Sequence, residues 1–383
     1  MTLSLDPKQE VRVMIGASEA DADLLYACRM FVPDPVLCIV QGATTYLFLS
    51  ELEYDRGTRQ ARGCVVLPLG TFEQWWREQT GGARPSLATL AGSLMMDRGI
   101  GTVTVPSHMS IAAVRDLERC GLLVEVAQGP FWPERRIKGG GEVQAIQAAL
   151  NIAQSAIAHA IEIVGAASID NDGVLIWQGG ILTSERLRGE ANAHMVRLGG
   201  IPKHTITACG AQAADPHEVG SGPVRAGETL VLDFFPRDER SGYFGDITRT
   251  VVKGRANDEI KRRYELVRQG QQWMIDTLHA GVDGGRLHEQ LMARFTQEGY
   301  PTAVWEGRRV GFFHGTGHGL GLEIHEAPRI GINSGILDDG VVVTVEPGLY
   351  DPRVGGIRLE DVVWIQKDGA VNLTTAPKVL EIE

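Results

Sequence analysis

The chain has 383 residues, of which 43% are hydrophobic and 22% are charged, and its formal net charge is -11. This length is sufficient for two domains with separate hydrophobic cores. The acidic balance argues against a nucleic-acid groove or a polybasic membrane surface, because both need clustered Lys and Arg. We therefore expect a peptide or small-molecule substrate, and neither nucleic acid nor membrane as a partner.

The cysteines and the N-terminal residues bear on the cellular compartment. The 5 cysteines are far apart and include no CxxC pair, so neither a disulfide framework nor a zinc finger is expected. The opening MTLSLDPKQE lacks the charged and apolar regions of a secretory signal, and no run of 18 apolar residues follows. These features predict a cytoplasmic protein.

The first third of the chain alternates between short β-rich runs and helical patterns. The runs are VLCIV, TTYLFLS, GCVVLP, TVTV and LLVEV, and SIAAVRDLERCG has a helical pattern. This alternation predicts an α/β domain over residues 1–130. The segment GPFWPERRIKGGG follows, and its prolines and consecutive glycines interrupt both helix and strand. We predict a linker there, with the boundary near Pro130.

The remaining residues, 131–383, mix helices and strands without regular alternation. Helical patterns begin at EVQAIQAAL, TSERLRGEA, DEIKRRYEL and GGRLHEQLM. Strand-like runs are HTITACG, TLVLDFF, YFGDITRTVV, VVVTVEP and IRLEDVVWI. The pattern predicts a second domain of the α+β class with an antiparallel sheet.

Two aspartates interrupt neighbouring strand-like runs of this second domain. Asp233 and Asp246 are joined by a polar, glycine-containing connection that suits a hairpin. Under the strand period of two, Asp233 shares a face with Val231 and Phe235, so its side chain is expected to face packed interior. A buried carboxylate needs a partner.

Two glutamates occur in similar strand contexts. Glu346 ends the run VVVTVEP, and Glu360 lies in GIRLEDVVWI on the same face as Arg358. A salt bridge or a turn explains one such acid by itself. Four of them together indicate a shared cation.

Three histidines fall within the glycine-rich segment HGTGHGLGLEIHEAP. His314, His318 and His325 are separated by glycines that allow close approach of the backbone to a site. One imidazole with four carboxylates is a hard, oxygen-rich ligand set, which favours Mn²⁺, with Co²⁺ or Zn²⁺ as alternatives. The four negative charges balance two divalent ions. The other histidines, among them His204 and His288, are expected to be surface or packing residues.

The motifs together resemble those of a known family. Their order and spacing are similar to those of the pita-bread metallopeptidases, peptidase family M24, which include prolidase, aminopeptidase P and methionine aminopeptidase. The resemblance covers roughly residues 136–380. It implies a pita-bread catalytic domain, a smaller creatinase-type α/β domain before it, and a homodimer. The motifs that carry it are ACGAQAADPH, LDFF with GDITRT, HGTGHGLGLEIHEAP, TVEPGLY and GIRLED.

The resemblance also assigns the metal ligands. By position in the motifs, the ligands of the two ions correspond to Asp233, Asp246, His318, Glu346 and Glu360.

Further residues of the motifs correspond to the substrate side of the family's site. His217 resembles the substrate-side histidine, His325 the histidine that stabilises the tetrahedral intermediate, and His314 a residue lining the substrate pocket. Arg358 resembles the arginine of prolidase and aminopeptidase P, where methionine aminopeptidases have an uncharged residue. The resemblance therefore favours cleavage of Xaa-Pro bonds.

The mechanistic hypothesis is hydrolysis by a water that bridges the two ions and ionises at neutral pH. Glu346 would accept the proton of that water and pass it to the leaving nitrogen. His325 and His217 would hydrogen-bond the developing oxyanion and the substrate backbone.

Alternatives remain open at this point. They are a pita-bread aminopeptidase without proline specificity, and a family member that has lost catalysis and serves as a binding protein. Creatinase shares the architecture but lacks the full ligand set present here. The connection between Asp233 and Asp246 is slightly longer than is usual in the family, and a shift of register would turn one aspartate away from the site. The sequence leaves the choice between dipeptides and longer peptides undecided.

Overall fold

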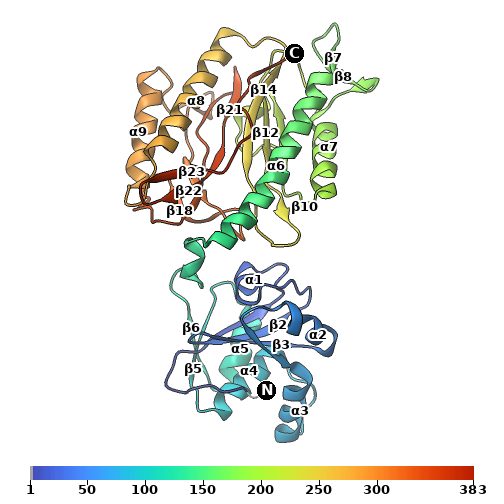
Figure 1. Cartoon of the computed structure of the whole chain (residues 1–383), viewed down its shortest axis with the longest axis vertical. Helices are drawn as coiled ribbons and strands as arrows, with labels where there is room; N and C mark the ends of the chain where they lie inside the picture. Colours follow the sequence, from blue (N-terminus) through green and yellow to red (C-terminus); the bar gives the residue numbers. More distant parts are fainter. Residues whose placement is uncertain (1–2) are drawn as a thin grey trace. The chain divides into compact units, whose positions relative to one another are not determined.

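The computed structural model describes residues 3–383 and divides into two compact units, Met1–Arg135 and Arg136–Glu383. Figure 1 shows the elements of each unit in chain order. The predicted linker, residues 129–141, contains the point of division. Each unit has its own hydrophobic core.

The N-terminal unit is built on a mixed sheet with the strand order β4-β3-β2-β1-β5-β6. The strands are β1 (Arg12–Gly16), β2 (Val36–Gln41), β3 (Thr44–Leu49), β4 (Cys64–Pro68), β5 (Thr102–Val105) and β6 (Leu123–Val126). The helices are α1 (Ala22–Cys28), α2 (Glu51–Gln60), α3 (Leu69–Thr80), α4 (Leu87–Asp97) and α5 (Ile111–Arg119). The strands and the helix predicted for this region are confirmed.

Strand β2 shows why this sheet is covered on both faces. All of its residues are buried, as expected for a central strand. Leu37 and Ile39 belong to one hydrophobic cluster, whereas Cys38 and Val40 belong to another. Because successive side chains point to opposite faces, the strand supplies two cores.

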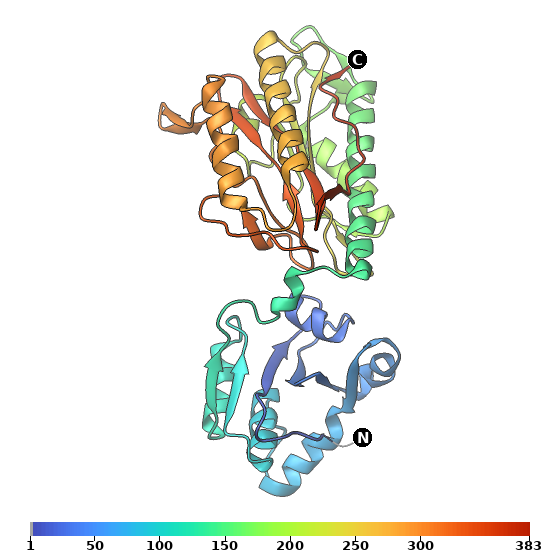
Figure 2. The same ribbon diagram turned by 60° about the vertical axis from the view of Figure 1, so that its left-hand side comes forward.

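The C-terminal unit contains the longer helices predicted from the sequence. They are α6 (Gly140–Ala166), α7 (Ser184–Arg197), α8 (Asp258–Thr277) and α9 (Gly284–Gln297). Helices α6 and α7 pack together, and α6 lies against strands β12 (Leu230–Phe234) and β14 (Ile247–Lys253). Helices α8 and α9 lie side by side in Figure 2 and cover the other half of the unit.

The strands of this unit form two principal sheets. The first has the order β11-β12-β14-β24, with β11 at Ile206–Cys209 and β24 at Glu381–Ile382. The second has the order β18-β17-β19-β22-β23. Its strands are β17 (Gly317–Gly319), β18 (Glu326–Ile330), β19 (Val342–Val345), β22 (Asp361–Gln366) and β23 (Gly369–Asn372). Most pairings are antiparallel, as predicted.

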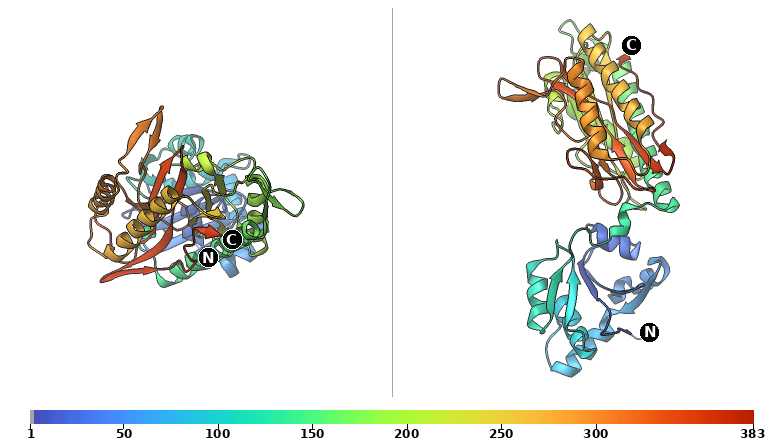
Figure 3. Two further views of the ribbon diagram at one scale, coloured as in Figure 1. Left: turned by 90° about the horizontal axis from the view of Figure 1, so that it is seen from above. Right: turned by 90° about the vertical axis from the view of Figure 1, so that its left-hand side faces the viewer.

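Shorter strands complete the C-terminal unit. The hairpin of β15 and β16 stands away from the body of the unit in Figure 3. The short strands are β7 (Ser168–Ile169), β8 (Leu175–Trp177), β9 (Gly180–Ile181), β10 (Gly200–Ile201), β13 (Arg237–Asp238), β15 (Ala303–Trp305), β16 (Arg308–Val310), β20 (Gly348–Asp351) and β21 (Gly355–Arg358). A 3₁₀ turn, η1 (Pro133–Arg136), precedes α6, and another, η2 (Gly210–Ala214), follows β11.

The start of α6 corrects one sequence-based expectation. The glycines predicted to interrupt regular structure include Gly140 and Gly141, which form the first turn of the helix. Gly139 is the N-cap, and its backbone N–H donates to the Glu142 carboxylate at 2.9 Å. The backbone amides at the start of a helix have no acceptor within the helix, and here the Glu142 side chain supplies one for the N-cap amide. This cap favours the start of the helix at the glycines.

Helix α6 is also notable for its length and apolar character. By length and composition alone, it is the one helix among the described residues that could cross a membrane. However, 50% of its most apolar 18-residue stretch is buried inside the protein. The buried residues recur at helical spacing, including Ile146, Leu150, Ala153 and Ile157. This stripe faces β12 and β14, so α6 is a core helix of the sheet that carries the site.

Candidate metal centre

Strands β12 and β14 bring the two aspartates together. Asp233 lies on β12, and Asp246 immediately precedes β14. The two strands pair in register, with Asp233 opposite Thr248 and Phe234 opposite Ile247. The longer connection is accommodated in the loop that contains β13, so it does not shift this register. Both aspartates line the same cavity.

The second sheet supplies the other predicted ligands. His318 is the middle residue of β17, and Glu346 directly follows β19. Glu360 was expected within a continuous strand, but it lies in the break between β21 and β22. Its backbone N–H donates to the Thr248 carbonyl at 3.1 Å, which ties this break to β14.

All the predicted site residues line one cavity of about 860 Å³ in the C-terminal unit. They come from both sheets and from the loops between the strands. They are His217, Asp233, Asp246, His314, His318, His325, Glu346, Arg358 and Glu360.

The donor atoms of the predicted ligands converge on one wall. Ligand atoms of Asp246, His318 and Glu360 lie within 4.8 Å of one another. His318 Nε2 is 3.7 Å from Asp246 Oδ2 and 3.5 Å from Glu346 Oε1. The other ring nitrogen, Nδ1, lies 3.1 Å from the Gly319 carbonyl oxygen, which can accept its proton. That hydrogen bond leaves Nε2 free to act as a metal ligand.

Asp233 is only half satisfied by protein groups. Its Oδ2 accepts a hydrogen bond of 2.6 Å from Arg358 Nη2. Its Oδ1 is buried and has no hydrogen-bond partner among the described residues. A buried carboxylate oxygen without a donor is costly, and a cation beside it would remove that cost.

The electrostatics of the group favour the binding of a positive charge. Burial and the neighbouring carboxylates raise the pKa of Asp246 and that of Glu360 well above their usual range. Burial, assisted by Asp233, raises the pKa of Glu346 to about 7, although Arg358 opposes the shift. Burial and the nearby His325 lower the pKa of His318 to about 3. The imidazole is therefore neutral, as a ligand must be.

The residues fit divalent cations. Four carboxylates and one neutral imidazole form a hard, oxygen-rich set. Arg358 compensates part of their charge, but it bonds only Asp233 within the group. Thr248 Oγ1 donates to Glu360 Oε2 at 2.7 Å, which orients that carboxylate from behind.

Next to the acids, a hydrogen-bonded chain joins three buried or half-buried groups. Arg358 Nη1 donates to the Tyr350 hydroxyl oxygen at 3.0 Å, and that hydroxyl lies 2.8 Å from His314 Nε2. Burial raises the pKa of Tyr350 to about 12. Burial and Arg358 lower the pKa of His314 to about 3. The His314 ring is thus neutral, and its Nε2 can accept a hydrogen bond from the Tyr350 hydroxyl, which holds the ring at the cavity wall.

The more open wall carries His217, His325 and Arg329, all of them exposed. The His325 ring meets the His318 ring edge to face, with centroids 4.4 Å apart. Burial, Arg329 and His217 lower the pKa of His325. Imidazole N–H groups that line an open cavity can donate hydrogen bonds to a bound substrate.

Several residues near the site were missed by sequence reasoning. Tyr350 accepts a hydrogen bond from Arg358, and Thr248 donates one to Glu360. Each of the two lies in or beside a motif that the sequence shows. Thr248 is two residues beyond Asp246 in a strand-like run, and Tyr350 ends the motif TVEPGLY. His204 is an exposed surface residue, as expected, and it also lines the cavity, which its sequence context does not indicate. The expectation of a surface or packing residue also holds for His288, which is buried on α9 and bonded to the Thr316 hydroxyl at 2.8 Å.

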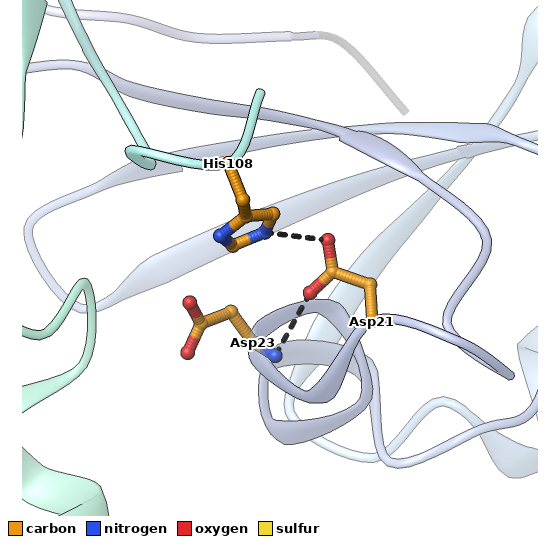
Figure 4. A group of neighbouring side chains, drawn as sticks. All are labelled: Asp21, Asp23 and His108. Carbon is orange, nitrogen blue, oxygen red and sulfur yellow. Dashed lines mark hydrogen bonds and ion pairs between the residues drawn. The ribbon is translucent and has the colours of Figure 1, made fainter. Parts of the chain in front are cut away.

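A second group of possible ligands occurs in the N-terminal unit, where Asp21, Asp23 and His108 gather (Figure 4). Asp21 caps α1 by accepting from the Asp23 and Leu24 amides, and its other oxygen is 2.9 Å from His108 Nε2. Asp23 is paired with Arg135 at 2.7 Å. Each carboxylate already has protein partners, so this group requires no ion.

Comparison with known proteins agrees with the geometry. A family model described as metallopeptidase family M24 matches residues 144–367. The Xaa-Pro dipeptidase of Pyrococcus furiosus is 32% identical over 347 residues, which cover 89% of this chain and 88% of that protein. The Xaa-Pro dipeptidase of Pyrococcus horikoshii is 27% identical over 349 residues, or 89% and 87% of the two chains.

Solved structures share the fold over nearly the whole chain. The X-Pro aminopeptidase of Thermotoga maritima superposes with a TM-score of 0.81 at 23% identity and covers 98% of both chains. The prolidase of Pyrococcus furiosus gives a TM-score of 0.76 at 25% identity and covers 96% of this chain and 97% of its own. The predicted pita-bread fold is confirmed.

The fold and the site define a metal-dependent hydrolase that acts on peptides. With the family model matching more than half of its length, the chain belongs to metallopeptidase family M24.

Proposed function

We propose that the chain hydrolyses Xaa-Pro bonds at the N-terminus of dipeptides or short peptides. The observation that carries the proposal is the convergence of buried carboxylates and a neutral imidazole on one wall of an open cavity. The preference for proline is supported by the two relatives described above, which are both named Xaa-Pro dipeptidases. Arg358, bonded to Asp233, supports the same subfamily.

The residues that would hold two divalent ions are Asp233, Asp246, His318, Glu346 and Glu360. Mn²⁺ is the proposed metal, with Co²⁺ or Zn²⁺ as alternatives, because hard oxygen ligands dominate the set. When bound, such ions polarise the scissile carbonyl and lower the pKa of water.

The protein's own groups would then transfer protons and position the substrate. Glu346 is the proposed proton acceptor, and it returns the proton to the leaving nitrogen. His325 and His217, on the open wall, donate hydrogen bonds to the carbonyl oxygen as it gains charge and to the substrate backbone. His314 lines the pocket, and its orientation is fixed by Tyr350.

The test is hydrolysis of Ala-Pro, Ala-Pro-Ala and Met-Ala-Ser by metal-stripped protein resupplied with Mn²⁺, with Glu346→Gln as the inactive control. Cleavage of Ala-Pro that needs metal and is lost in the variant supports a prolidase-type dipeptidase. Cleavage of Ala-Pro-Ala alone indicates the aminopeptidase P type. Cleavage of Met-Ala-Ser alone would refute the proline preference in favour of a different aminopeptidase specificity.

Two further expectations from the sequence stay predictions. A homodimer is checked by sedimentation or light scattering of the purified protein, and a cytoplasmic location by fractionation of cells that express it.

A further inference from the structure

A buried ion pair lies close to the site but outside the proposed ligand set. Lys138 Nζ donates to Glu326 Oε2 at 2.8 Å, and the two side chains are only 1% and 6% exposed. Lys138 lies between η1 and α6, and Glu326 begins β18, 188 residues further along the chain. Opposite charges removed from water are tolerated only when they are well paired, so removing one member of this pair is expected to disturb the other.

The lysine end of the pair is anchored by the backbone. The Lys138 N–H donates to the Gly340 carbonyl at 2.9 Å. Two residues earlier, Arg136 Nη2 bonds the Ile336 carbonyl and the Asp338 carboxylate, each at 2.9 Å. The segment containing Lys138 is therefore tied to the loop before β19.

The glutamate of the pair contacts the segment that lies between the site histidines His318 and His325. Glu326 directly follows His325, and its Oε1 accepts from the Glu323 N–H at 3.1 Å. A Cβ at Gly321 would lie 2.5 Å from Glu326 Oε2, so the carboxylate occupies the space that this glycine leaves. The Glu326 carboxylate therefore contacts the turn that follows His318, while the backbone of Glu326 directly follows His325.

We propose that Lys138 is a positioning residue, which holds the Glu326 carboxylate in place and thereby fixes His325 against the His318 ring. The inference rests on the proposed role of His325 in stabilising the oxyanion. Without the ammonium group, the carboxylate loses the ion pair that holds it at 2.8 Å from Lys138 and is free to shift, which loosens the turn from Gly321 to Glu326. His325 then loses its alignment with the substrate carbonyl.

The test is a double-mutant cycle with Lys138→Met and His325→Ala, assayed on whichever peptide of the panel above the wild type cleaves fastest. In the wild-type background, Lys138→Met is expected to lower kcat about 10- to 100-fold, with KM changed by less than about twofold. In the His325→Ala background, the same change is expected to have little further effect, because its action passes through the missing imidazole. Equal losses in both backgrounds would show a general structural role and overturn the proposal.

Hydrogen exchange of the peptide covering residues 320–327 gives a readout that does not need activity. Lys138→Met is expected to speed exchange there, and unchanged exchange would contradict the proposal. The matched control is Arg135→Met, which breaks the ion pair with Asp23 in the N-terminal unit and is expected to change neither kcat nor this exchange.

A second variant covers the case in which Lys138→Met does not fold. Glu326→Gln breaks the ion pair while keeping an oxygen for the Glu323 amide, and it is expected to show the same dependence on His325. If only Met-Ala-Ser is cleaved, the proposed proline preference fails while the cycle can still be read. Equal losses caused by Glu326→Gln with and without His325 would reject the positioning role by themselves.

Discussion

Each unit of the molecule brings two aspartates or glutamates and a histidine into one small group, and the two groups differ in what surrounds them. In the N-terminal unit, Asp21 caps a helix and bonds His108, and Asp23 pairs with Arg135. In the C-terminal unit, carboxylates face one another, and burial with mutual repulsion raises the pKa of Asp246 and of Glu360. Both groups consist of carboxylates and a histidine, so it is the unmet charge of the C-terminal group that marks it as the candidate metal centre.

The largest expected effect is on catalysis and concerns Glu346. Replacement by Gln removes both a proposed ligand and the proposed proton acceptor, so we expect kcat for Ala-Pro to fall by about 10² to 10⁴-fold or more. Steady-state kinetics at saturating Mn²⁺ measure it. An Asp21→Asn protein serves as the matched control from the other group and is expected to retain wild-type kcat. Activity of Glu346→Gln within a few-fold of wild type would contradict the proposed role.

Metal binding separates the two groups directly. Free Mn²⁺ at about 100 times its Kd is expected to stabilise the wild type by about 3 kcal/mol, since the ion binds only the folded state. Thermal unfolding with and without Mn²⁺ measures this. Asp246→Asn is expected to abolish the gain, and Asp21→Asn to preserve it. A full Mn²⁺ response in Asp246→Asn, or its loss in Asp21→Asn, would reverse the assignment.

Asp351 lies in the C-terminal unit but is well paired. It therefore tests whether the pKa of an acid is set by its hydrogen-bond partners or by the unit in which it lies. Burial alone would raise its pKa, but hydrogen bonds from Arg353 and Arg263 lower it to about 2. A folded-state pKa below the unfolded value stabilises the protein at higher pH, and this stabilisation is lost as pH falls through the folded pKa.

We therefore expect Asp351→Asn to cost about 2 kcal/mol near neutral pH and progressively less as pH drops from about 4 toward 2. Urea unfolding of both proteins across this range measures the difference. A gap that stays constant with pH would mean that the carboxylate's charge is not what stabilises this region.

The smallest expected effect concerns the structural group itself. Asp21→Ala removes the cap of α1 and is expected to destabilise the N-terminal unit by about 1 kcal/mol. Urea unfolding followed by tryptophan fluorescence measures the loss, and kcat should not change. A change in Mn²⁺ dependence of this variant would indicate that the N-terminal group takes part in metal binding after all.

Much of the architecture could be predicted from local pattern. The helical stripe of α6 and the alternation in β2 reflect periods of 3.6 and 2, which residue order alone reveals. Element ends were less predictable. Consecutive glycines predict a break at Gly140 and Gly141, whereas the structure begins α6 there, with the Gly139 amide bonded to the Glu142 carboxylate. The break at Glu360 likewise depends on its attachment to β14.

Residue order was enough to predict the chemistry available to the site, because acids within apolar runs and a histidine among glycines restrict what can be buried together. It also determined the family, through the order of the motifs. Which polar groups find hydrogen-bond or ion-pair partners could not be predicted in this way, because it depends on contacts between segments far apart in the chain. Arg358 reaches Asp233 across 125 residues, and Lys138 reaches Glu326 across 188. No local pattern records that Asp233 Oδ1 is among the buried oxygens left without a partner in the described part of the chain, and this is the observation that favours a cation beside Asp233.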